Sequence, residues 1–165
     1  MEESRVGVKK HDADCADVTR ITRKDWEMDA ELKHSELTEK LINTYYALYN
    51  ELGYGFLESV YQKAFALMLT ERGIGFREQS PIRVMFHGID MGEFFGDLLV
   101  ESVLLVELKA LRALEQAHER QLLNYLRATD VEVGLLFNFG PRPQFRRLAF
   151  DNSRKGRNAK AASQP

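Results

Sequence analysis

The sequence lacks several features that define common protein classes. Cys15 is its only cysteine, so an internal disulfide is impossible, and sites built from several thiolates, such as a four-cysteine iron–sulfur cluster, are excluded. No stretch approaches the roughly 20 apolar residues that a membrane span needs. The N-terminal segment also lacks the apolar region of a secretory signal. We therefore expect a cytoplasmic protein that does not use a membrane.

The chain also lacks an excess of basic residues, because its formal net charge is −2. Proteins that bind nucleic acid usually carry a basic patch, so the negative net charge argues weakly against nucleic acid as a partner. The distribution is uneven, however. Only Asp151 offsets seven basic residues near the C-terminus, which are Arg142, Arg146, Arg147, Arg154, Lys155, Arg157 and Lys160. This end of the chain either contacts phosphate or forms a solvated, disordered tail.

The length of 165 residues, with 44% hydrophobic and 29% charged residues, fits one ordinary globular domain. Residues 1–34 mix both charge signs without a sustained period, and we expect a flexible extension there. Residues 35–150 carry the periodic patterns of a folded domain. Residues 151–165 form the expected basic disordered tail.

Two helices are expected at the start of the domain. The first begins near Ser35, a suitable N-cap, and has apolar side chains at helical spacing (Leu37, Leu41, Tyr45 and Leu48). Gly53 and Gly55 then interrupt it. A second helix is predicted from about residue 56 to residue 72, ending at Gly73.

The period changes to that of strands after Gly75. Alternating residues predict a strand over 81–88, and residues 93–100 and 103–109 predict two strands joined by a tight turn at Glu101 and Ser102. A third helix is expected at 114–128, a nearly apolar strand at 131–140 and an edge strand at 145–150. This order predicts an α/β fold, a mixed sheet with helices packed against it.

Three charged residues interrupt the apolar strands of the predicted hairpin. Side chains alternate along a strand, so Glu107 and Lys109 point to the same side, and Asp97 lies on the neighbouring strand, offset from the direct partner of Glu107. Two nearby carboxylates repel each other unless a divalent cation lies between them, and Mg²⁺ needs few protein ligands. The alternative is a salt-bridged hairpin at a solvated sheet edge. The confinement of charge to one end of "LLVELK" favours the metal site.

Two helical patterns add candidate residues. Glu58 and Tyr61 share one face of the second helix, where Glu58 interrupts the apolar stripe. On the third helix, Gln121 and Tyr125 are one turn apart, with His118 one turn earlier. Taken singly, these residues are more often an exposed glutamate and a core tyrosine.

These motifs occur in the order GxxExxY (Gly55, Glu58, Tyr61), Asp97, Glu107-Leu108-Lys109 and QxxxY (Gln121, Tyr125). The succession resembles the GxxExxY protein family, which is placed in the PD-(D/E)xK nuclease superfamily near its RecB-like branch. The resemblance covers about residues 37–150. It implies a restriction-endonuclease-like mixed sheet core flanked by helices.

The resemblance also implies roles for the candidate residues. Glu58 is the helical acid of the site, Asp97 and Glu107 bind the metal with Glu58 as a further ligand, and Lys109 is the catalytic lysine. Gln121 and Tyr125 are an accessory pair that supports the substrate or the lysine. The sequence departs from the family where Gly96 replaces the proline of the PD motif and Tyr54 replaces a proline of the first motif. Neither change removes a functional side chain.

The leading hypothesis is a Mg²⁺-dependent nuclease, in which Mn²⁺ can substitute, that hydrolyses phosphodiester bonds of DNA through metal-activated water. The alternative is a catalytically weak or inactive nuclease-fold protein that acts as a nucleic-acid-binding or assembly module. A third hypothesis, a metal site of unrelated chemistry at His87 or His118, is weaker because neither histidine has a second one at ligand spacing. A homo-oligomer is compatible with the resemblance.

Overall fold

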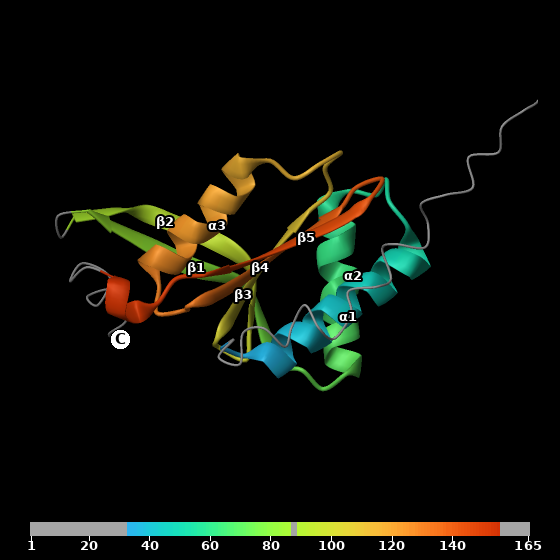
Figure 1. Ribbon diagram of the computed structural model, residues 1–165, viewed down its shortest axis with the longest axis horizontal. Helices are drawn as coiled ribbons and strands as arrows, with labels where there is room; N and C mark the ends of the chain where they lie inside the picture. The colour runs from blue at the N-terminus through green and yellow to red at the C-terminus, as the bar shows by residue number, and fades with distance from the viewer. Residues whose placement is uncertain (1–32, 87–88, 156–165) are drawn as a thin grey trace, which may run out of the picture. The chain divides into compact units, whose positions relative to one another are not determined.

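The computed structural model describes residues 33–86 and 89–155. Three predictions concern residues outside this part of the chain: the flexible extension up to residue 32, the candidate metal ligand His87, and residues 156–165 of the basic tail. The elements, in chain order, are α1 (Ser35–Leu52), α2 (Glu58–Glu71), β1 (Phe76–Phe86), β2 (Ile89–Val100), β3 (Leu104–Lys109), α3 (Gln116–Ala128), β4 (Val133–Phe139), β5 (Pro143–Ala149) and a short 3₁₀ helix (Asn152–Arg154) (Figure 1).

The five strands form one mixed sheet in the order β1-β2-β3-β4-β5. Only β3 and β4 run parallel, and α3 makes the crossover between them, as a parallel pair requires. The other three pairs are antiparallel. The predicted α/β fold is therefore confirmed, together with the order of its elements.

Helices α1 and α2 pack on one face of the sheet through a cluster of aromatic side chains. Tyr45 of α1 stacks on Phe137 at 4.5 Å between ring centroids, and Tyr61 of α2 stacks on Phe139 at 4.1 Å. Phe65 adds a tilted contact with Phe137. Large rings bury much apolar surface and gain from offset stacking, so this cluster fixes both helices against β4.

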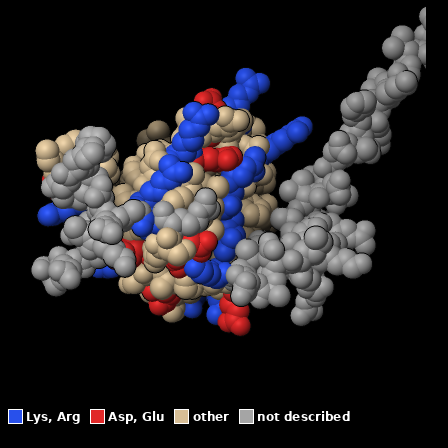
Figure 2. Space-filling model, turned by 60° about the vertical axis from the view of Figure 1, so that its left-hand side comes forward, with Lys and Arg blue, Asp and Glu red and all other residues tan. Residues whose placement is uncertain are grey.

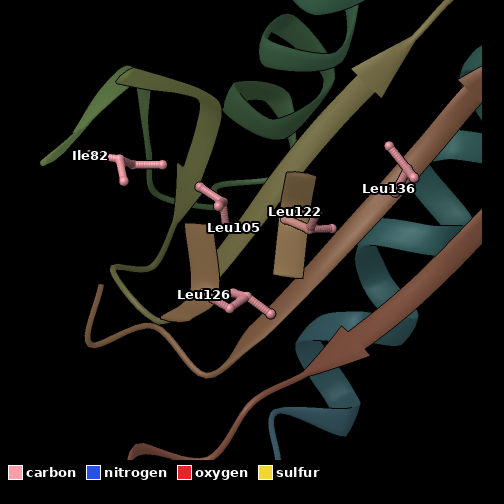
Figure 3. Packing of buried hydrophobic residues seen from close by; sticks show 5 residues of the cluster. All are labelled: Ile82, Leu105, Leu122, Leu126 and Leu136. Atoms are coloured by element: carbon pink, nitrogen blue, oxygen red, sulfur yellow. The ribbon is translucent and has the colours of Figure 1, made fainter. Parts of the chain in front are cut away.

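Helix α3 covers the opposite face. Leu122 and Leu126 are fully buried and pack with Ile82, Leu105 and Leu136 (Figure 3). Leu136 and Phe137 are neighbours in β4, so strand alternation places α3 and α1 on opposite sides. Gly134 admits Leu122 closely, because a Cβ at Gly134 would lie 2.8 Å from the Leu122 Cδ1 atom.

The connection between β2 and β3 differs from the predicted two-residue turn. Residues 101–103 form the turn, with Glu101 and Ser102 both at positive φ, and Leu98 pairs with Val106. The extra residue shifts the register by one. A turn at Glu101 and Ser102 alone would have paired Val106 with Asp97, whereas its partner is Leu98, so the predicted register of the hairpin is wrong by one residue. Asp97 and Glu107 lie just beyond this last pair of the ladder.

The described structure continues beyond residue 150, where the basic tail was expected to begin. The Lys155 ammonium donates to the carbonyls of Thr129 and Val131 at 2.6 and 2.9 Å, just after α3 ends. Asn152 bonds to Glu132 and Asp130. These contacts attach residues 151–155 to the domain.

No helix in the described part of the chain is both long and apolar enough to cross a membrane.

Candidate active site in the fork between β2 and β3

The candidate site forms where β2 and β3 separate. Their ladder ends at Leu98 and Val106, and beyond this point the Asp97 side chain replaces the missing backbone partner. The Leu108 N–H donates to Asp97 Oδ2 at 2.8 Å. The Gln62 amide of α2 donates to Asp97 Oδ1, also at 2.8 Å. Asp97 is thus held from both sides, with each oxygen retaining capacity to accept another bond.

Glu107 is the most deeply buried carboxylate of the site, with 4% of its surface exposed. Its Oε2 atom lies 3.6 Å from the Lys109 ammonium, but its Oε1 atom is buried without a hydrogen-bond partner. Burial and the negative charge of Asp97 raise the pKa of Glu107 from 4.5 to about 7, although Lys109 and the backbone N–H of Asp97 oppose this shift. An unpartnered buried oxygen is unfavourable unless something else compensates it.

Lys109 lies between two acids. Its ammonium is 3.6 Å from Glu107 and 3.9 Å from Glu58 Oε1, and it is mostly buried. Glu58 is the first residue of α2. Burial raises the pKa of Glu58, while Lys109 and the Ala110 N–H lower it. Burial also raises the pKa of Asp97, against the opposing effects of the Leu108 N–H and Lys109.

The spacing of the GxxExxY motif has a local structural basis. Gly55 has a φ of 108°, which a residue with a side chain rarely adopts. The Tyr61 hydroxyl donates to the Gly53 carbonyl at 3.0 Å and accepts from the Phe56 N–H at 3.3 Å. Tyr61 thereby ties together the loop that precedes Glu58. Its ring is fully buried against Phe139, so the position of Glu58 is fixed by the core.

The predicted accessory residues bond to each other on α3. Gln121 donates to the Tyr125 hydroxyl at 2.8 Å on α3. Among the described contacts, neither side chain bonds to Asp97, Glu107 or Lys109. His118, on the same helix, interacts electrostatically with the site, because it lowers the pKa of Glu58. Its Nδ1 atom accepts from the Glu115 N–H and caps α3.

Two residues near the site were missed by reasoning from sequence. Gln62, the partner of Asp97, lies one helical turn after Glu58, and this spacing was an available signal. Asn138 is fully buried, opposite Lys109 in the β3–β4 register. Its amide donates to the Leu111 carbonyl at 3.0 Å and accepts from the Leu111 N–H at 2.9 Å. Asn138 therefore holds the loop that follows Lys109.

The donor set fits a divalent cation at Asp97 and Glu107. The two carboxylates repel each other, and the buried Oε1 atom of Glu107 lacks a partner. A cation held between them would compensate both effects, and carboxylate oxygens are the ligands that Mg²⁺ prefers. Across residues 33–86 and 89–155, however, no group of three His, Cys, Asp or Glu side chains is arranged to hold an ion. The role of Glu58 as a further ligand stays a prediction.

Residues 35–148 match the family described as the PD-(D/E)XK nuclease superfamily. The chain belongs to this superfamily. Among solved structures, the "Crystal structure of SSO0001" is similar at 15% sequence identity and a TM-score of 0.46, over 56% of this chain and 50% of that one. This chain thus spans about half the length of that structure. No curated protein matches the sequence significantly.

Membership of the PD-(D/E)XK nuclease superfamily accords with the fold and with the type of side chain gathered in the fork. Members of this superfamily are typically metal-dependent and act on nucleic acid. Lys and Arg side chains spread over the face drawn in Figure 2, with Asp and Glu between them. Some basic groups near the C-terminus are engaged within the domain, as Arg146 pairs with Glu119 at 3.0 Å.

Proposed function

We propose that this protein is a Mg²⁺-dependent nuclease of the GxxExxY type that hydrolyses phosphodiester bonds of DNA. The observation that carries the proposal is the electrostatic interaction of Asp97 with Glu107, whose buried Oε1 atom has no hydrogen-bond partner. The ion pair with Lys109 engages Oε2 and leaves Oε1 available to a further ligand. The Lys109 ammonium beside the two acids adds the third group that this chemistry needs.

The metal-binding residues in this proposal are Asp97 and Glu107. When bound, a divalent cation supplies a Lewis acid that polarises the phosphodiester and makes water a better nucleophile. Gln62 and the Leu108 N–H orient Asp97 for this task. Such partners of a metal ligand commonly contribute to affinity by fixing its direction.

Lys109 supplies positive charge that stays in place during the reaction. Its contacts with Glu107 and Glu58 hold the ammonium near the fork, where it offsets negative charge on the phosphorane-like transition state and orients the attacking water. Glu58 acts here as the group that positions the lysine. We assign Gln121 and Tyr125 a supporting role toward the substrate strand, on the face of the sheet that Glu107 and Lys109 share with α3.

The test is cleavage of single- and double-stranded DNA by purified protein with Mg²⁺ or Mn²⁺. Asp97→Asn and Lys109→Ala are each expected to lower the rate by at least about 100-fold, because each removes charge that the transition state requires. Glu93→Gln, an exposed carboxylate also on β2, is the matched control. Equal cleavage by all four proteins would contradict the proposal.

The second candidate function is a nuclease-fold binding or assembly module with little turnover. One observation favours it: the described residues contain no set of three ligands for an ion. If the protein is such a module, neither the wild type nor any of the three variants cleaves DNA, while nucleic-acid binding persists.

A further inference from the structure

An exposed aromatic loop adjoins the candidate site. The segment from Gly53 to Leu57, with sequence GYGFL, contains no charged residue and leads directly into Glu58. Tyr54, Phe56 and Leu57 expose 59%, 49% and 76% of their surface. Isolated exposed apolar residues are ordinary, but three of them in five consecutive positions form a patch.

The loop is held in one conformation before any ligand binds. The Tyr61 hydroxyl bonds to both Gly53 and Phe56, and the Phe56 ring packs edge-on against the Tyr61 ring at 6.1 Å. Tyr61 is itself buried. The Phe56 ring is fixed in advance by this contact and therefore loses little entropy on binding, which suits it to recognition.

The position of the loop limits what it contacts. Phe56 is two residues from Glu58, so the backbone between them spans at most roughly 7 Å. Glu58 lies 3.9 Å from the Lys109 ammonium, so a strand with its phosphate at Glu107 and Lys109 would have its neighbouring bases within reach of this loop. The loop has no charge with which to meet phosphate, whereas aromatic rings stack on bases of any sequence.

We propose that Tyr54 and Phe56 stack on unpaired nucleobases beside the scissile phosphate, so that the substrate is single-stranded or locally unpaired nucleic acid. In a duplex, the faces of the bases are covered by their neighbours, and only their edges are accessible in the grooves. The loop has no polar side chain apart from the Tyr54 hydroxyl with which to read those edges. This inference rests on the proposed nuclease site.

The experiment measures binding by fluorescence anisotropy in EDTA, so that hydrolysis plays no part. The probes are a labelled oligothymidylate of about 12 nucleotides, an abasic strand with the same phosphates, and a duplex of the same length. Wild-type protein is expected to bind the oligothymidylate most tightly. Tyr54→Ala and Phe56→Ala are each expected to weaken that binding by roughly 5- to 100-fold and to leave binding of the abasic strand unchanged.

Further variants separate stacking from loss of fold. Tyr54→Phe and Phe56→Trp keep a ring and are expected to bind as wild type, whereas Tyr54→Leu keeps only apolar surface and is expected to bind weakly. Tyr54 is the sharper position, because Phe56 also packs on Tyr61. Leu67→Ala, an exposed leucine further along α2, is the control.

The stacking proposal is overturned if the ring-deleting variants bind the oligothymidylate as wild type does, if the abasic strand or the duplex binds equally well, or if no single strand binds. Failure of the nuclease proposal has a different signature. If only the nuclease proposal fails, binding of the oligothymidylate still depends on the rings of Tyr54 and Phe56, but neither the wild type nor any variant cleaves DNA in the presence of Mg²⁺.

Discussion

Glu107 and Asn138 are buried polar side chains on adjacent parallel strands, and their surroundings differ. Asn138 is fully buried, and its amide makes both bonds that the Leu111 backbone offers. Glu107 is almost as buried, yet its Oε1 atom has no partner and its pKa is raised to about 7. Asn138 has the environment of a structural residue. Glu107 has one carboxylate oxygen without a partner, as the proposed cation site requires.

The comparison predicts opposite effects on stability, and the largest belongs to Asn138. Asn138→Leu leaves the N–H and carbonyl of Leu111 without their partners inside the protein. A fully buried unsatisfied group costs about 1–3 kcal/mol, but these two bonds are partly buried, so we expect the free energy of unfolding to fall by roughly 2–4 kcal/mol in urea denaturation. Asn124→Leu, at an exposed position on α3, is the control and should change it by less than about 0.5 kcal/mol.

Glu107→Gln is expected to stabilise the metal-free protein at pH 8. The folded protein holds this proton more tightly than the unfolded chain, so stability falls as pH rises from 4.5 to about 7 and is level above that. Removing the charge recovers at most about 3 kcal/mol at pH 8, since one pKa unit corresponds to about 1.4 kcal/mol. Thermal melting at pH 4 and pH 8 measures the difference between variant and wild type. A difference that is the same at both pH values would refute the assignment.

Gln62→Leu tests how Asp97 is held. The substitution removes the amide that bonds to Asp97 Oδ1 but keeps the apolar stem of the side chain. We expect metal affinity and cleavage to fall by about 10- to 100-fold, as for other partners of metal ligands, with little loss of stability. Lys63→Ala, the next residue on α2, should leave both unchanged. Metal titration and cleavage rates provide the two readings.

Tyr61→Phe is expected to have the smallest effect. It deletes the hydroxyl that joins Gly53 to Phe56 and retains the buried ring. Loss of these two bonds should lower the free energy of unfolding by about 1–2 kcal/mol. Tyr54→Phe removes an exposed hydroxyl and serves as the comparison. If both variants unfold alike, Tyr61 does not hold the loop.

Local patterns in the sequence predicted most of the fold. Helical spacing located α1, α2 and α3, and alternation or apolar runs located the five strands, because each pattern reflects burial. However, β1 begins at Phe76 and β2 at Ile89, earlier than the predicted residues 81 and 93. The convergence of Asp97 and Glu107 was also predicted. Their register was wrong by one residue, because the turn includes Val103 and because turn length depends on backbone geometry that apolar patterning leaves open.

The parts that sequence reasoning missed depend on contacts between distant segments. Asn138 interrupts an apolar strand, but its bonds to Leu111 exist only once α3 has crossed over the sheet. The separation of β2 from β3 beyond Leu98 likewise arises from the pairing of each strand with its other neighbour. The unpartnered Oε1 atom of Glu107 lies on β3 just beyond the last pair with β2, and no pattern in residues 104–109 alone reveals it.

Calorimetric titration with Mn²⁺ at pH 8 tests the central claim most directly. The account predicts saturable binding to wild-type protein, loss of that binding in Glu107→Gln and in Asp97→Asn, and unchanged binding in the Glu93→Gln control. Binding that is equally strong in all four proteins, or absent from wild type, would contradict the claim that Glu107 is left unsatisfied for a cation.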